Sequence, residues 1–251
     1  MPRTIVVTGA SSGIGRATAL ELAARGHTVA LGARRADAVA EAVAEVTAAG
    51  GRAVAHPLDV ADPTSIDAFF AAVEGEVGAP DAVVNNAGTA MPGDVAAVSP
   101  SALRSMVETN LMGALLVTQR ALPTMCAANR GDIVFISSDS VERPRPGLVC
   151  YSATKAAVEH VARGLALELE GTGVRVSTVR VGPTLTGFAD SWGLDGDEFM
   201  ALVERWQKVG EQRHFNTCDP QDQARAISNV IDTPEGVWTP IVEVQPMPPA
   251  Q

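Results

Sequence analysis

The stretch TIVVTGASSGIGRATALELAAR, residues 4–25, decides the fold. Its first four residues form an apolar run that predicts a buried strand. A glycine loop follows, and the residues from Arg16 to Arg25 show an amphipathic helical pattern. Strand, glycine loop and helix in this order build a phosphate site, because glycines let the backbone approach a pyrophosphate while the N–H groups of the helix N-terminus face the anion. The stretch therefore predicts an α/β fold with a dinucleotide site.

A second stretch, YSATK at residues 151–155, carries the chemistry. It contains Tyr151, the only tyrosine of the chain, and Lys155, one of two lysines. Residues four apart share one face of a helix. A unit positive charge ~4 Å away, at an effective dielectric of ~20, contributes ~4 kcal/mol, which matches the ~3 pKa units that separate a phenol from a base near pH 7. We predict that Lys155 lowers the pKa of Tyr151. The alternative is an interfacial tyrosine and a solvated lysine on an ordinary amphipathic helix.

Four motifs follow one another along the chain. They are the glycine loop, the run NNAG at residues 85–88, Ser138 at the end of an apolar run, and the Tyr-x-x-x-Lys pair. Together they resemble the short-chain dehydrogenase/reductase family, of the NADP-preferring carbonyl reductase type. The resemblance is close over residues 3–186 and loose beyond. It implies an oxidoreductase that interconverts a ketone or aldehyde and an alcohol by hydride transfer.

The resemblance assigns roles to four catalytic residues. Tyr151 would be the general acid/base, and Lys155 would bind the nicotinamide ribose. Ser138 would hydrogen-bond the reacting oxygen, and Asn110 would hold a proton-relay water. Without the other three, Asn110 would read as a capped or kinked position in a packed helix. A catalytically idle NADP(H)-binding regulator is the alternative, and its mark would be a missing member of this set. None is missing.

The resemblance also implies a set of cofactor contacts. In chain order they are Gly9, Ser11, Ser12, Gly13, Ile14, Gly15, Arg34, Arg35, Asp59, Val60, Asn86, Gly88, Tyr151, Lys155, Gly182, Thr184 and Thr186. Asp59 matches the position that contacts adenine. Val181 stands where the family usually has a proline, so the loop that holds the carboxamide is expected to be less rigid.

The residues after the second apolar run should select the cofactor. No carboxylate stands where a NAD enzyme grips the ribose 2′-hydroxyl, and Arg34 and Arg35 follow instead. A 2′-phosphate suits a guanidinium that binds it bidentately. We predict NADP(H), with Arg34 as the main contact. The alternatives are arginines that solvate the start of the next helix, and a NAD-dependent or non-redox enzyme on the same scaffold.

Apolar runs alternate with helical patterns along the whole chain. This alternation predicts a single Rossmann-like α/β domain over residues 1–251, with a doubly wound parallel sheet of about seven strands and helices on both faces. The expected strands lie near residues 4–8, 28–33, 53–57, 82–86, 132–137, 175–181 and 241–244. Three helices should start at Asp62-Pro63, Ser99-Pro100 and Asp219-Pro220, because each pair puts a capping side chain before a proline.

Composition narrows the class of partner. With 251 residues, 46% of them hydrophobic, the chain can bury one substantial core. A net charge of −10 argues against nucleic acid or an anionic membrane surface as a partner. No apolar stretch approaches the ~20 residues of a membrane span, so we expect a cytoplasmic protein. The odd number of cysteines predicts reduced thiols, and the scattered histidines predict no metal.

Two segments bear on the substrate, a small-molecule carbonyl or alcohol. Residues 187–216 lie where the family carries a mobile lid, and their aromatic residues fit either a dry, bulky-substrate pocket or a covered core or interface. These residues are Phe188, Trp192, Phe199, Trp206 and Phe215. The loop at 139–148 adds Glu142, Arg143 and Arg145. If one of these pointed inward it would favour a polar or charged substrate, which conflicts with an aromatic lid.

The resemblance also implies self-association. The long helices near 99–122 and 151–169 would pair across two-fold axes and give a homodimer or homotetramer. The C-terminal end, from Pro246 to Gln251, is rich in proline and departs from the family. The tetramer is therefore less secure than the dimer.

Overall fold

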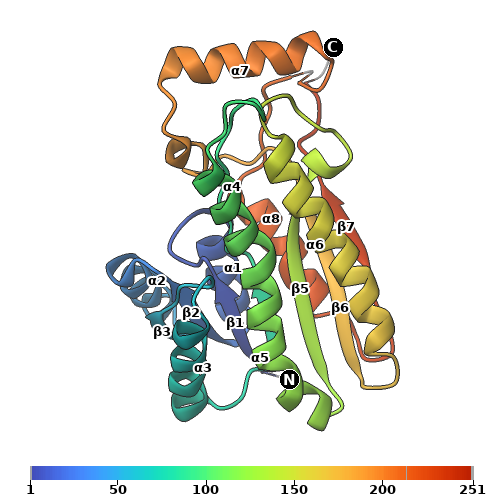
Figure 1. Ribbon diagram of the computed structural model, residues 1–251. Helices are drawn as coiled ribbons and strands as arrows, with labels where there is room; N and C mark the ends of the chain where they lie inside the picture. Colours follow the sequence, from blue (N-terminus) through green and yellow to red (C-terminus); the bar gives the residue numbers. More distant parts are fainter. Residues whose placement is uncertain (1, 213, 250–251) are drawn as a thin grey trace.

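The computed structural model describes residues 2–212 and 214–249, and Figure 1 shows their arrangement. Four positions of the expected domain lie outside the described residues, including Arg213 of the expected lid and the last two residues of the C-terminal end. Seven strands are present: β1 (Thr4–Thr8), β2 (Thr28–Ala33), β3 (Arg52–Pro57), β4 (Ala82–Asn85), β5 (Gly131–Ser138), β6 (Val174–Val181) and β7 (Ile241–Val244). The expected strands are confirmed, to within one residue at each end.

The strands form one parallel sheet in the order β3-β2-β1-β4-β5-β6-β7. The chain first moves outward from β1 to β3 and then returns to the other side of β1. Its order therefore reverses between β1 and β4, which is where open α/β sheets place their ligands. The expectation of a doubly wound parallel sheet is confirmed.

Helices cover both faces of the sheet. In chain order the helices of the described residues are α1 (Gly13–Ala24), α2 (Ala36–Ala48), α3 (Pro63–Val77), α4 (Pro100–Val107), α5 (Gly113–Ala127), α6 (Val149–Glu168), α7 (Gly196–Lys208), which lies away from the sheet, and α8 (Pro220–Ile231). Short turns complete the order, namely the π-helix η1 (Glu108–Met112) and the 3-10 helices η2 (Asp139–Val141) and η3 (Ala189–Trp192). Helices α3, α4 and α8 begin at the three proline pairs, as the sequence predicts.

Capping side chains fix two of these starts. The side chain of Asp62 accepts a hydrogen bond from Thr64 N at 2.9 Å, and that of Ser99 accepts one from Ala102 N at 3.2 Å. Each cap satisfies a backbone donor that the helix itself leaves open.

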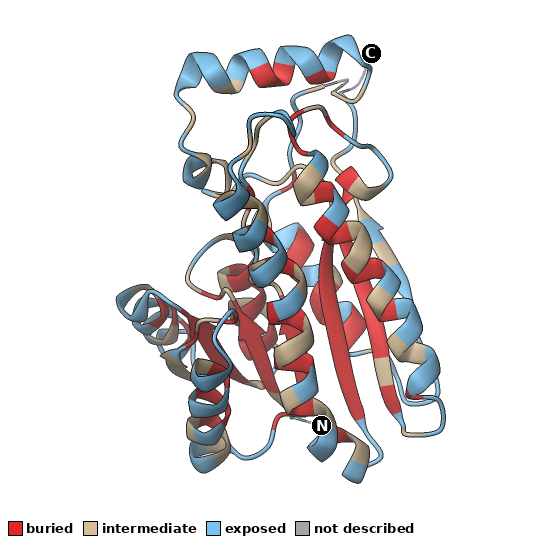
Figure 2. Cartoon of the chain, viewed as in Figure 1, coloured by how far each residue is buried: buried red, intermediate tan, exposed pale blue. Residues whose placement is uncertain are grey.

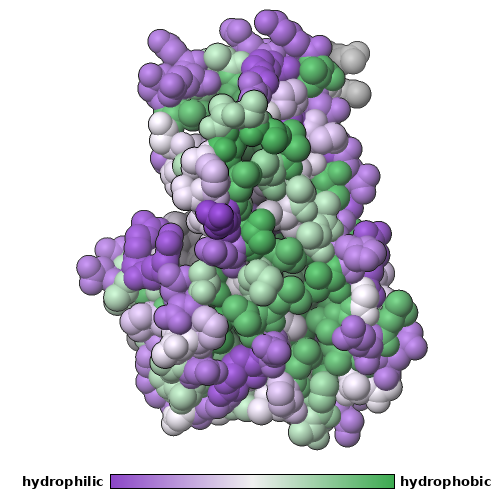
Figure 3. All heavy atoms as spheres, viewed as in Figure 1, coloured by the Kyte–Doolittle hydropathy of each residue, from purple (hydrophilic) through white to green (hydrophobic). Residues whose placement is uncertain are grey.

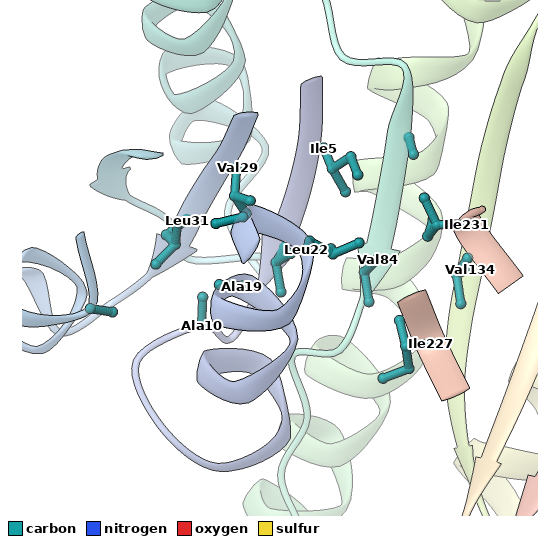
Figure 4. Packing of buried hydrophobic residues seen from close by; sticks show 14 of the residues in the cluster. Ile5, Ala10, Ala19, Leu22, Val29, Leu31, Val84, Val134, Ile227 and Ile231 are labelled. Carbon is teal, nitrogen blue, oxygen red and sulfur yellow. The ribbon is translucent and has the colours of Figure 1, made fainter. Parts of the chain in front are cut away.

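Two apolar clusters lie on opposite sides of the sheet. Ile5 and Val7 of β1 belong to the cluster beneath α1, α2 and α8, whereas Val6 belongs to the cluster beneath α3, α5 and α6. This alternation follows from the two-residue period of a strand. Figure 2 shows the strands buried and the outer faces of the helices exposed. On the surface, apolar residues gather over α5 and α6 (Figure 3). Figure 4 shows the first cluster, with Leu22 from α1 and Ile227 from α8.

The lid segment has a small core of its own. Helix α7 stands apart from the sheet, at the top of Figure 1. Its Leu202, Val203 and Trp206 pack with Leu148 in a cluster separate from the two large ones. In the part of the chain that the structure describes, no helix combines the length and apolar character needed to cross a bilayer.

Candidate active site

The predicted site residues gather at the carboxyl ends of the strands. Ser138 is the last residue of β5, and Tyr151 and Lys155 lie in the first two turns of α6. Asn110 lies in η1, between α4 and α5. The glycine loop leaves the carboxyl end of β1, on the other side of the reversal point. The topology therefore brings both predicted halves of the site to one edge of the sheet.

The glycine positions of this loop do not favour a side chain. Gly9 and Gly13 have φ angles of +65° and +55°, a region that favours glycine. A Cβ atom on Gly15 would lie 2.5 Å from Gly9 O. Ser12 is the N-cap of α1, but its hydroxyl accepts a hydrogen bond from Arg35 at 3.1 Å and does not cap the helix. The Ser12 side chain thus leaves the backbone N–H groups of the first helical turn facing outward, where they can bind an anion. The pyrophosphate of a dinucleotide fits this site.

The run after β4 braces this loop. Asn86 Nδ2 donates to Thr8 O at 2.9 Å and to Gly9 O at 3.3 Å. Thr8 Oγ1 in turn accepts from the backbone nitrogens of Asn86 and Ala87, at 3.0 and 2.9 Å. Asn86 therefore has a structural role in shaping the loop. An added Cβ on Gly88 would lie 3.5 Å from Lys155 Nζ and 3.4 Å from Asn110 Oδ1, which places Gly88 beside two of the predicted catalytic residues.

The two arginines after β2 differ in their contacts. One terminal nitrogen of Arg35 donates to Ser11 Oγ at 3.0 Å and to Ser12 Oγ at 3.1 Å, so this guanidinium lies on the glycine loop. Arg34 is exposed. The sequence argument relied mainly on Arg34, whereas the structure places Arg35 against the loop. Sequence offers no signal that separates two adjacent arginines.

Asp59 and Val60 follow β3 and lie near the same edge. Asp59 Oδ1 accepts from Ala61 N at 3.0 Å, and Asp59 N donates to Ser65 Oγ at 2.9 Å, so local turns hold this residue. Val60 is buried against Gly113, where an added Cβ would lie 2.7 Å from Val60 Cγ2. Val60 thus packs against the start of α5.

The loop after β6 contributes the third part of the predicted cofactor site. Val181 continues β6, pairing with Ser138 on one side and Val244 on the other. Thr186 lies against the glycine loop, because a Cβ on Gly13 would be 3.2 Å from its Cγ2 atom.

Two other predicted contacts in this loop have partners within the protein. Thr184 Oγ1 donates to Gly182 O at 2.8 Å and accepts from Gln223 at 3.1 Å. Gly182 N donates to Val244 O at 2.9 Å. These hydrogen bonds shape the loop. A surface hollow of about 330 Å³ opens beside Gly13 and Thr186, between α1 and the start of α8.

Asn110 connects three segments of the site. Its Oδ1 accepts from Thr89 N at 2.7 Å, and its Nδ2 donates to Thr89 O at 2.9 Å and to Thr154 Oγ1 at 3.0 Å. The side chain is buried, and these contacts use most of its hydrogen-bonding capacity. A π-helical turn carries it, which often marks a functional position. The sequence predicted an ordinary helix here and contains no signal for the wider turn.

The hydroxyls of Ser138 and Tyr151 and the ammonium of Lys155, which are predicted to be catalytic, lie in a largely buried environment. Lys155 Nζ donates to Ile136 O of β5 at 2.8 Å and lies 5.9 Å from the centroid of the Tyr151 ring. Burial lowers the pKa of Lys155 to about 8. Tyr151 is half-buried, and Ser138 forms a hydrogen bond with it.

The pKa of Tyr151 differs from the sequence expectation. The pKa of Tyr151 is raised to about 12: burial is the largest cause and the charge of Asp139 adds to it, whereas the hydrogen bond to Ser138 and the charge of Arg145 act in the opposite direction. The prediction that Lys155 lowers this pKa is wrong for this arrangement. Burial outweighs the other effects, and the ammonium binds the carbonyl of β5 instead of the phenol.

Of Glu142, Arg143 and Arg145 in the loop after β5, one side chain points inward and the other two lie near the surface. Arg145 points inward and is buried, but its two terminal nitrogens bind the carboxylate of Asp139 at 2.9 and 2.6 Å. Glu142 binds Arg180 at 3.0 Å, and Arg143 lies 3.4 Å from Glu243. The inward arginine is therefore already paired, which removes the conflict with an apolar lid. The sequence argument missed Asp139, although a carboxylate next to a buried strand end is a visible signal.

Aromatic rings connect Tyr151 to the lid. The centroid distances are 6.0 Å from Tyr151 to Phe188, 6.1 Å from Phe188 to Trp192, and 6.1 Å from Trp192 to Phe199. Phe215 is 63% exposed and lies apart, at an open hollow near the C-terminal end. Most of the predicted lid aromatics therefore form one row that starts at Tyr151.

A polar network behind α6 was also missed from sequence. Glu159, one turn after Lys155, accepts from Ser137 Oγ at 2.7 Å and from Arg180 at 2.8 and 2.9 Å. It ties α6 to β5 and β6 behind the catalytic residues. Charged residues inside strand patterns are the signal that could have found it.

A family model described as short chain dehydrogenase matches residues 3–196. The chain belongs to the short-chain dehydrogenase family. This confirms the resemblance drawn from the four motifs, and members of the family are oxidoreductases that act on alcohol and carbonyl groups.

Individual relatives agree with the family assignment. The chain is 36% identical to the cis-4-hydroxycyclohexanecarboxylate dehydrogenase of Sinomonas cyclohexanicum, with 90% of this chain and 88% of the relative covered. It is also 36% identical to the glycine betaine reductase ATRR of Emericella nidulans, where 97% of this chain matches only 19% of the relative's length. A serine dehydrogenase, solved in a closed form with NADP+, superposes with a TM-score of 0.85 at 28% identity, over 96% of this chain and 94% of the other.

Proposed function

We propose that this short-chain dehydrogenase is an NADP(H)-dependent oxidoreductase that reduces a ketone or aldehyde to an alcohol, with Tyr151 as the general acid. The observation that carries the proposal is the arrangement at the carboxyl end of β5, where Ser138 ends the strand and α6 places Tyr151 and Lys155 beside it, with Lys155 Nζ 5.9 Å from the centroid of the Tyr151 ring. Two hydroxyls side by side can bind one carbonyl oxygen and deliver a proton to it. We also propose that the chain acts as a single catalytic domain with residues 187–216 as the substrate lid.

The cofactor would lie across the point where the strand order reverses. The glycine loop and the N-terminus of α1 would hold its pyrophosphate, and Arg34 and Arg35 would bind its 2′-phosphate. Asp59 would contact adenine, Lys155 the nicotinamide ribose, and Thr186 the carboxamide. NADP+ in the serine dehydrogenase of the same fold supports this choice. When bound, NADPH supplies the hydride that the reaction requires.

The protonation state of the phenol favours reduction. With a pKa of about 12, Tyr151 holds its proton at neutral pH and is ready to donate it. Ser138 would orient the carbonyl oxygen beside that proton. Asn110 is braced by Thr89 and Thr154 and would position a relay water that restores the proton. Burial of the site excludes bulk water and so strengthens these contacts.

The proposal is tested by a panel of ketones, aldehydes and secondary alcohols. Turnover is followed by the absorbance of the reduced nicotinamide, with NADPH and NADH compared for the carbonyls and NADP+ and NAD+ for the alcohols. We expect reduction of at least one carbonyl with NADPH. Tight NADPH binding without turnover of any panel member, and with the same result in Tyr151→Phe, would instead support the idle regulator.

We also propose that the protein forms a homodimer or homotetramer through α4, α5 and α6. Val107 of α4, Met112 of η1 and Leu167 of α6 expose 43%, 45% and 70% of their surfaces, and Figure 3 shows apolar surface over α5 and α6. Burial of such a face stabilises association. Light scattering at micromolar concentration should give the mass of a dimer or of a tetramer. A monomer would contradict the proposal.

A further inference from the structure

A buried ion pair lies directly beside the two catalytic hydroxyls. Asp139 follows Ser138 in the chain, and Ser138 Oγ lies 3.4 Å from Asp139 Oδ1. Both carboxylate oxygens of Asp139 accept hydrogen bonds from Arg145, and the two side chains are only 4% and 8% exposed. A full negative charge thus contacts the hydroxyl proposed to orient the substrate, and a full positive charge balances it.

The lid covers this pair. The guanidinium of Arg145 lies 5.7 Å from the centroid of the Trp206 ring, and Trp206 Nε1 donates to Pro146 O at 2.8 Å. Helix α7 therefore keeps bulk water from the ion pair. Charges that are poorly hydrated act more strongly on their neighbours than charges at the surface.

Stability alone does not account for the pair. Burial of two charges costs free energy, and their mutual attraction often does no more than offset that cost. Apolar residues of similar volume can stabilise a fold equally well. Removing one partner is a different matter, because it leaves an unbalanced charge in the interior. Here that charge would face the proton-transfer site.

We propose that Asp139 and Arg145 form a charge-neutral positioning pair, in which Arg145 balances a carboxylate that would otherwise face Ser138 and Tyr151 alone. The proposal rests on the proposed function, since it concerns the proton that Tyr151 donates. Neither residue touches the reacting atoms: Arg145 acts through Asp139, and Asp139 acts through its field and through Ser138.

The charged and hydroxyl groups around the phenol agree with this role. Ser138 faces it from β5, Asp139 from η2, Arg145 from the following loop and Lys155 from α6. Asp139 raises the pKa of Tyr151, and Arg145 lowers it. Glu211, just after α7, adds its own field at Arg145. Loss of Arg145 would therefore make the phenol a weaker proton donor.

The single tyrosine of the chain allows a direct test. The tyrosinate absorption band reports on Tyr151 alone, with Tyr151→Phe as the blank, and the measurement needs neither cofactor nor substrate. A stopped-flow pH jump records ionisation before the protein unfolds. Since a unit charge within roughly 10 Å at an effective dielectric of about 20 moves a pKa by about one unit, Arg145→Met should raise the pKa of Tyr151 by about one unit. Asp139→Asn should lower it by a similar amount, and the double variant should lie close to the wild type.

Two further variants serve as controls. Arg143→Met removes an arginine of the same loop, which pairs with Glu243 at the surface, and should leave the pKa of Tyr151 unchanged. Arg145→Lys retains the positive charge and should largely preserve the wild-type value. If Arg145→Met alone fails to fold, the comparison of Asp139→Asn with the double variant carries the same test.

Opposite shifts in the two single variants, with cancellation in the double variant, support the pair. Shifts of the same sign, or no shift, in variants with native circular dichroism spectra would overturn it. Because the titration needs no turnover, this result is independent of whether a carbonyl substrate is found. The proposed function fails separately, through the substrate panel.

Discussion

The glycine loop and the lid are held by different kinds of contact. In the glycine loop, hydrogen bonds to Thr8 and backbone crowding at Gly15 fix the conformation. In the lid, contacts between side chains fix the conformation. Trp206 Nε1 donates to Pro146 O at 2.8 Å, and aromatic rings with centroids about 6 Å apart form a row from the lid to Tyr151. Crowding and turn geometry follow from a short motif. Contacts between distant side chains follow only from the complete fold.

The glycine loop and the lid also differ in the number of buried apolar residues that support them. The glycine loop leaves β1, whose Ile5 and Val7 belong to the large cluster beneath α1 and α8. The lid rests on a separate group of four buried residues, with partly buried residues packed around it. Regions with few buried apolar contacts open at a lower free-energy cost than the rest of a protein. We therefore expect the lid to open for substrate while the cofactor cradle stays rigid.

The largest expected effect lies at Tyr151, where the two regions meet. Tyr151→Phe removes the proton donor and keeps the ring that contacts Phe188. General acid catalysis is worth ~10²–10⁴-fold, so kcat should fall by about that factor while NADPH affinity stays within a few-fold. Steady-state kinetics and a fluorescence titration of NADPH measure the two quantities. Retention of most of the activity would show that another group donates the proton.

The residues around Tyr151 show what sequence can predict here. The spacing of Tyr151 and Lys155, together with Ser138 at a strand end, predicted that these three residues meet at one edge of the sheet, and the structure places them there. The same reasoning gave the wrong sign for the tyrosine pKa. Motif spacing contains no information on burial, and burial is the largest influence on this pKa. The ion pair of Asp139 and Arg145 depends on the path of a loop, which the motifs do not specify.

A smaller effect tests the rigid region, at the two arginines. The double variant Arg34→Ala/Arg35→Ala should lose the preference for NADPH over NADH, by ~10- to 150-fold, because a charge-assisted hydrogen bond is worth ~1.5–3 kcal/mol. Arg35→Ala alone should also weaken NADH binding slightly, since it removes the contacts to Ser11 and Ser12. Arg34→Ala should leave NADH affinity nearly unchanged. Titration of both cofactors decides the matter: an equal loss for both in the Arg34 variant would make that residue structural.

The lid resists prediction for a physical reason. Its aromatic residues are visible in the sequence, but apolar rings at this spacing fit a pocket wall, a covered core and a subunit interface equally well. The structure places Phe188, Trp192 and Phe199 in one row from Tyr151 and leaves Phe215 outside it. Only the complete fold could show which rings lie near Tyr151 and which do not, because this depends on where a long loop returns to the sheet.

The smallest expected effect concerns the ring at the inner end of that row. Phe188 lies 6.0 Å from Tyr151 and would form the wall against which a substrate packs. An aromatic contact of this kind is worth ~0.5–1.5 kcal/mol beyond area burial, so Phe188→Ala should lower kcat/KM for an aromatic ketone by about 2- to 12-fold. A small aliphatic ketone, which cannot reach the ring, should be reduced at nearly the wild-type rate. Phe199→Ala, at the far end of the row, is the matched control and should affect both ketones little. If Phe188→Ala lowers the rates for both ketones equally and also lowers Tm, the row of rings supports the lid structurally and does not form a pocket wall. The glycine loop would then still be rigid, but the lid would not face the substrate.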